Sequence, residues 1–163
     1  YHDLELTHHL HVEYDASTFD TDPFEPQPDG IRTVFPVWVP APRGDGGYVE
    51  LPYTLPQDMT LFVLLRQHGI DTWRRKLDWV AARGGMALLI THPDYMVFNG
   101  SHPGIDEYPS SLYGDFLNDI KDRYAGECWH ALPRDVARFW NTTIKKSNQP
   151  LRPRKDVASR VVT

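Results

Sequence analysis

The sequence predicts an α/β fold built on a parallel sheet or a (β/α) barrel. From residue 71 onward its patterns indicate helix, strand, helix, strand and helix, an alternation typical of parallel sheets rather than of β-sandwiches. A continuous apolar run from Met86 to Ile90 follows two glycines and precedes Pro93, and it indicates a strand buried on both faces. At 163 residues the chain is long enough for one domain with a sizeable core.

Before residue 71 the elements are shorter. Residues 3–9 fit a short helix or its last turns, and residues 10–14 alternate apolar and polar side chains as a strand does. The loop over 15–23 is crowded with carboxylates and hydroxyls. Such a loop can cap a helix, form turns, bind a cation or orient a catalytic group.

Two extended segments follow, and each contains a proline: 34–39 with Pro36, and 47–55 with Pro52. Because proline cannot donate to a ladder of hydrogen bonds, we expect edge or irregular strands there. A short helix then covers residues 61–65, with Asp58 and Thr60 as candidate caps.

Three longer helices show apolar residues at helical spacing. The first runs from Asp71, its expected N-cap, to Arg83, the second ends at Gly126, and the third opens over 131–134. Their apolar faces are Trp73, Leu77 and Val80; Leu112, Phe116, Ile120 and Tyr124; and Val136, Phe139 and Trp140. Between them we expect a long loop over 95–108, of the kind that often binds ligands, and an extended piece over 127–130.

Composition excludes several classes of protein. A net charge of -5 and a pI near 5.9 argue against a general nucleic-acid or anionic-membrane binder. The one cysteine, Cys128, excludes an internal disulfide, and neither a signal peptide nor a membrane span is visible. Basic residues gather late among prolines, so we divide the chain into a domain over 1–143 and a solvated tail over 144–163.

The histidines are the first candidates for chemistry. His92 lies just past the end of the apolar run, where α/β folds collect catalytic groups, so it is a candidate acid or base; the alternative is a surface histidine. His9 and His11 would share one face of a strand near His8 and could bind one ion. Zinc usually needs a third protein ligand, so the default interpretation is a polar cluster at a helix end.

Two short stretches resemble the polysaccharide deacetylase family, whose NodB-homology fold is an irregular (β/α) barrel. They are Ile90-Thr91-His92-Pro93-Asp94-Tyr95 and Tyr14-Asp15-Ala16-Ser17-Thr18-Phe19-Asp20. Leu55-Pro56-Gln57-Asp58 and Trp129-His130-Ala131-Leu132-Pro133-Arg134 add to the likeness, which covers most of residues 1–143. The resemblance implies an incomplete or irregular barrel of the deacetylase type.

The resemblance also implies an activity, the metal-dependent removal of acetyl groups from a carbohydrate. His92 maps onto the histidine that gives a proton to the leaving amine, and Asp15 or Asp20 would support the catalytic groups, one of them orienting the imidazole. Asp94 and Tyr95 would contact substrate, although Asp94 could equally tune His92 or form a turn, and Tyr95 could pack beneath the pocket.

The family's base, paired-histidine and arginine motifs have no counterpart in this sequence. The resemblance therefore places the ligands of a divalent metal, often zinc, upstream of residue 1, and none of the chain's own residues is assigned to it. The chain begins at Tyr1 rather than methionine, and we expect it to be the downstream part of a longer polypeptide, with any export signal upstream. We expect a cytoplasmic location, a carbohydrate substrate, no nucleic acid and no membrane insertion; the sequence leaves the oligomeric state open.

A second hypothesis is a non-catalytic carbohydrate-binding domain on a deacetylase-like scaffold. Aromatic side chains would then stack on sugars, the candidates being Trp38, Tyr48, Tyr53 and Tyr95, unless they belong to the core. A third is a different metal hydrolase that uses some of the eight histidines.

Overall fold

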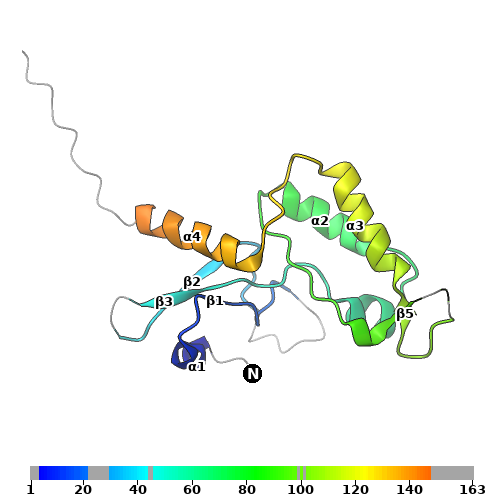
Figure 1. Ribbon diagram of the computed structural model, residues 1–163, viewed down its shortest axis with the longest axis horizontal. Coiled ribbons are helices and arrows are strands. Elements are labelled where there is room, and N and C mark those ends of the chain that lie inside the picture. The colour runs from blue at the N-terminus through cyan, green and yellow to red at the C-terminus, as the bar shows by residue number, and fades with distance from the viewer. Residues whose placement is uncertain (1–3, 22–29, 44–45, 99, 101, 148–163) are drawn as a thin grey trace, which may run out of the picture.

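The computed structural model describes residues 4–21, 30–43, 46–98, 100 and 102–147. Its helices and strands form two regions (Figure 1). The first holds a three-stranded sheet in the order β1-β3-β2, with β1 parallel and β2 antiparallel to β3. Its elements are α1 (Leu4–Thr7), the 3-10 helix η1 (His8–Leu10), β1 (Tyr14–Asp15), β2 (Val37–Pro40) and β3 (Gly47–Glu50), and the late helix α4 (Pro133–Ser147) packs on β1 and β3.

The second region contains a pair of helices that lie side by side in Figure 1. An aromatic core joins them to a π-helix, and a pair of short parallel strands lies at its edge. Its elements are η3 (Met59–Leu64), α2 (Asp71–Ala81), the 3-10 helix η4 (Pro93–Tyr95), β4 (Met96–Val97), β5 (Tyr108–Pro109) and α3 (Ser111–Arg123).

Each region has its own hydrophobic cluster. In the second region four aromatic rings contact in a chain, with neighbouring centroids 4.8–4.9 Å apart, in the order Tyr108, Phe62, Trp73 and Phe116. In the first region a smaller cluster of Val49, Leu51 and Ala137 seals the sheet against α4. The aromatic cluster is therefore the larger apolar support, and the candidate site lies on it.

The predicted apolar faces are confirmed for α2 and for Phe116 of α3, whereas Phe139 of α4, which was expected on the buried face, is 59% exposed. Trp73, Leu77 and Val80 of α2 are buried, as is Phe116 of α3, because helical periodicity places them on the faces toward the core. The N-cap of α2 is Ile70 rather than Asp71, which is the first helical residue. Asp58 does cap η3, since its carboxylate accepts a hydrogen bond from the Met59 backbone N–H.

The prediction of a buried strand over 86–90 is wrong. The segment is half-buried and carries no regular ladder. Met86 N donates to Val34 O (2.7 Å), and Leu88 O accepts from Thr54 N (2.9 Å), so the run does lie between two other extended segments. Those segments contain prolines that cannot donate hydrogen bonds, which explains why the contact stays irregular.

Other boundaries also differ. The expected strand over 10–14 is reduced to Tyr14–Asp15, and the expected extended piece over 127–130 has no strand partner among the described residues. The expected start of the tail at residue 144 falls inside α4, and residues 148–163 lie outside the described part of the chain. The strands of the described ranges make sheets of three and two strands and close no barrel, so the barrel stays a prediction.

Candidate functional site

Two neighbouring segments bring Asp58 and His92 together. Thr54 and Leu88 are joined by hydrogen bonds in both directions: Thr54 N to Leu88 O, and Leu88 N to Thr54 Oγ1. Each segment then runs four residues farther, from 54 to 58 and from 88 to 92, and their ends meet. Trp73 fixes the turn before Asp58, because its indole N–H donates to Pro56 O (2.7 Å).

The carboxylate of Asp58 is fully buried and accepts four hydrogen bonds. Oδ1 lies 2.8 Å from Met59 N and 2.6 Å from His92 Nδ1. Oδ2 accepts from His92 N (2.6 Å) and from the Tyr108 hydroxyl (2.8 Å). An ionised carboxylate offers about four acceptor sites, so Asp58 is saturated as an acceptor. It can orient and balance its neighbours, but it has no acceptor site left for a water, a substrate proton or a metal ion.

The saturation of Asp58 determines what His92 can do. A carboxylate that only accepts requires a proton on Nδ1, which leaves Nε2 as the nitrogen available for chemistry. The His92 side chain is 37% exposed whereas that of Asp58 is 0% exposed, so the imidazole reaches from the core to solvent. Its other ring neighbour is Tyr95, with centroids 5.4 Å apart. The pair is a buried carboxylate that orients a solvent-facing imidazole, an arrangement suited to proton transfer at Nε2.

Tyr108 is a permanent donor in this arrangement. Burial raises the pKa of its hydroxyl far above the ordinary range, and the hydrogen bond to Asp58 raises it further. The phenol therefore stays protonated at any physiological pH.

The residues predicted as catalytic lie in different surroundings. His92 contacts buried Asp58, and its predicted role as an acid stays a prediction. Asp15 Oδ1 accepts from Ser17 Oγ (2.8 Å), and Asp20 Oδ2 accepts from Lys76 Nζ (2.6 Å). The carboxylate that orients the imidazole is Asp58 rather than either of these two; their predicted catalytic roles stay predictions.

The predicted substrate-binding residues flank the imidazole. Asp94 is exposed in the single turn of η4, directly after the proline that ends the segment of His92. Tyr95 is half-buried against His92 and packs on the aromatic cluster. Both positions permit substrate contact.

No family model, curated protein or solved structure matches this chain. The geometry of Asp58, His92 and Tyr108 therefore carries the functional assignment.

The N-terminal histidines do not lie on the expected strand. His8 and His9 lie in the 3-10 helix η1 and His11 has a left-handed backbone, so the strand that would align His9 with His11 is absent. Across the described ranges, no three His, Cys, Asp or Glu side chains are placed to hold a metal ion. In the same part of the chain, no helix is long and apolar enough to cross a membrane.

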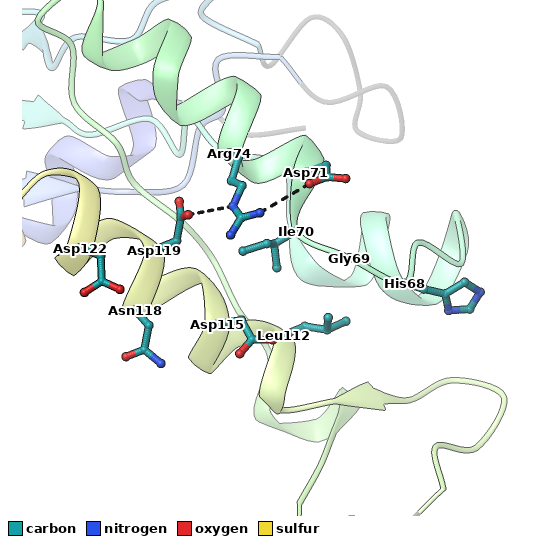
Figure 2. Close-up of a pocket in the computed structure, with 10 residues that line it drawn as sticks. All are labelled: His68, Gly69, Ile70, Asp71, Arg74, Leu112, Asp115, Asn118, Asp119 and Asp122. Carbon is teal, nitrogen blue, oxygen red and sulfur yellow. Dashed lines mark hydrogen bonds and ion pairs between the residues drawn. The ribbon is translucent and has the colours of Figure 1, made fainter.

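A surface cavity of about 440 Å³ lies elsewhere, between the start of α2 and one side of α3 (Figure 2). Its carboxylates are Asp71, Asp115, Asp119 and Asp122. Arg74 reaches toward two of them, with Nε 2.8 Å from Asp119 Oδ1 and NH1 3.8 Å from Asp71 Oδ1. The cavity is an acidic depression partly neutralised by its own arginine, and His92 does not line it.

Sequence reasoning found His92 but missed the roles of Asp58 and Tyr108. The sequence indicates Asp58 as a cap and as the end of a stretch that resembles the deacetylase family, but not as a partner of His92, although both residues end extended segments. That shared position was the available signal, because the ends of neighbouring segments meet. Tyr108 carries no comparable signal, since it enters the site from a strand 50 residues beyond Asp58.

Proposed function

We propose that this chain supplies the general acid of a metal-dependent hydrolase that removes acetyl groups from a carbohydrate. The observation that carries the proposal is the contact between buried Asp58 and solvent-facing His92. A sugar amine is a poor leaving group, and amide hydrolysis therefore needs a proton delivered to its nitrogen. Protonated His92 would deliver that proton from Nε2, while Asp58 stabilises the imidazolium and fixes its orientation.

The metal that such a reaction uses would polarise the acetyl carbonyl and the attacking water. Among the described residues, no three His, Cys, Asp or Glu side chains are placed to hold that metal, and none of the chain's residues is assigned to it. The chain's own contribution is limited to holding and moving one proton and to contacts from Asp94 and Tyr95 beside the imidazole.

A non-catalytic carbohydrate-binding domain fits the structure less well. Sugar stacking needs an open aromatic face, and Tyr48 and Tyr53 are only 1% and 6% exposed. Trp38 packs in the cluster beneath α4. Of the four aromatic candidates, Tyr95 alone lies beside His92, where a substrate for hydrolysis would also be bound.

The test is acetate release from an N-acetylglucosamine oligomer by the natural polypeptide that contains these residues, with zinc supplied. We expect His92→Ala to lower kcat by about 100-fold or more, the usual contribution of a general acid. His68→Ala is the control, because His68 is exposed and lies outside the site. Full activity in His92→Ala would exclude the acid role, and glycan binding without any turnover by the unmodified protein would favour the binding domain.

A further inference from the structure

Tyr108 enters the site from a separate part of the chain. β5 pairs in parallel with β4, and Tyr108 stands opposite Met96, just after η4. The Tyr108 ring is 2% exposed and lies 4.8 Å from the Phe62 ring, so the aromatic core fixes its direction. The hydroxyl reaches Asp58 Oδ2 at 2.8 Å.

The bond from Tyr108 is coupled to the bond that orients the imidazole. One carboxylate carries both, with Tyr108 on Oδ2 and His92 Nδ1 on Oδ1. A rotation of Asp58 that releases Nδ1 therefore also breaks the bond to Tyr108. The hydroxyl opposes that rotation although it does not touch His92.

We propose that Tyr108 is a positioning residue that holds the His92 imidazole in place through Asp58. Its catalytic meaning rests on the function proposed above, whereas its effect on the ring is a property of the folded chain alone. β5 therefore contributes to the site, because its Tyr108 is the fourth hydrogen-bond donor to Asp58.

The test compares two tyrosines that each donate to an aspartate. Tyr108→Phe removes one hydroxyl and keeps the packed ring. Tyr124→Phe is the matched control, since the Tyr124 hydroxyl donates to Asp78 Oδ1 (2.6 Å) on the exposed side of α2 and α3. The measurement is the exchange rate of the His92 Nδ1 proton with water, by NMR of the 163-residue chain with ¹⁵N-labelled histidine.

We expect Tyr108→Phe to speed this exchange by about tenfold or more, because the opening rotation no longer breaks a hydrogen bond to a charged group. Tyr124→Phe should leave it unchanged. Equal exchange in Tyr108→Phe and the unmodified chain would overturn the proposal, and so would equal acceleration in both variants.

A second measurement needs no variant. In the unmodified chain the Tyr108 hydroxyl proton and the His92 amide proton both point at Asp58 Oδ2, so they should show a cross-peak for protons in close contact. Its absence would also overturn the proposal. Neither experiment uses a substrate, so a failure to release acetate would contradict the hydrolase alone and leave the positioning result standing.

Discussion

Two buried carboxylates, one in each region, show how differently the same group can be used. Asp58 and Glu50 are both 0% exposed. Asp58 has two donors on each oxygen, and one of them is the Nδ1 of a solvent-facing imidazole. Glu50 has all its donors on Oε1, while Oε2 has no partner among the described residues. Burial alone therefore does not identify a functional carboxylate, whereas the identity of its partners does.

Glu50 has a structural role: it holds the backbone that follows β1. Its Oε1 accepts from Ser17 N (3.2 Å), Thr18 N (3.0 Å) and the Thr18 hydroxyl (2.6 Å). Those residues follow β1, which pairs with β3 through Asp15 and Glu50. Glu50 therefore anchors residues 17 and 18, which follow β1, to the sheet.

The largest contrast should come from replacing each carboxylate with its amide. In Asp58→Asn the new NH₂ group meets donors whichever way it points, so we expect a loss of about 2–4 kcal/mol in the free energy of unfolding. In Glu50→Gln the carbonyl can keep all three donors while the NH₂ takes the unpartnered side, so we expect a change below about 1 kcal/mol. Urea unfolding of the two variants measures both values.

Equal losses in the free energy of unfolding would show that the two carboxylates contribute equally to stability. That result would contradict the contrast drawn between Asp58 and Glu50. Asp58→Asn should also reverse the tautomer of His92, because an amide N–H beside Nδ1 favours a lone pair there. The ¹⁵N shifts of the ring report that reversal, and Glu50→Gln should not produce it.

A smaller effect should follow from Thr18→Val, which removes the shortest bond to Glu50. Thr18 is 2% exposed, so its hydroxyl has no water to replace this partner, and we expect a loss of about 1–2 kcal/mol in the free energy of unfolding. Thr21→Val is the control, because Thr21 is exposed and, within the described part of the chain, its hydroxyl bonds only to Asp20 (3.2 Å). If Thr21→Val lowered the free energy of unfolding as much as Thr18→Val, the structural role of Glu50 would be refuted.

The helices were predictable because their signal is local. A residue such as Phe116 is buried for a reason visible within one or two turns of its own helix. The strand expected over 86–90 failed because strand formation depends on the neighbour. Met86 and Leu88 are apolar, but the segments beside them contain Pro36 and Pro52 and cannot supply a full ladder.

The site was predictable only in part for a related reason. The position of His92 after an apolar run is a one-segment pattern, and the sequence alone indicated it. The partnership with Asp58 needs two segments in register, and the bond from Tyr108 needs a third that joins through β5. Asp15 and Asp20 were preferred because they lie in a motif, yet contact with His92 is decided by the pairing of Thr54 with Leu88.

Asp78 extends the comparison to an exposed carboxylate. We expect its replacement to have the smallest effect on stability. Its side chain is 47% exposed, and its partners are Arg123, the last residue of α3, and Tyr124, which follows it. The Tyr124 hydrogen bond, followed by the Arg123 guanidinium, lowers the pKa of Asp78, with partial desolvation opposing both. A lowered pKa in the folded state means that the stabilisation is complete above the unfolded value of about 3.9 and is lost as the pH falls through the lower folded value.

The unfolding midpoints of the unmodified chain and Asp78→Asn should therefore differ slightly at pH 7 and converge in acid, once the pH has fallen below the lowered folded-state pKa of Asp78 and the carboxyl is protonated in both states. Added salt should shrink the difference at pH 7, because the pair is open to solvent. Asp122→Asn, an exposed position also on α3, should show neither trend. If the difference in unfolding midpoint persisted in acid, the contribution of Asp78 would not depend on its charge. Asp78 would then have a structural role like that of Glu50.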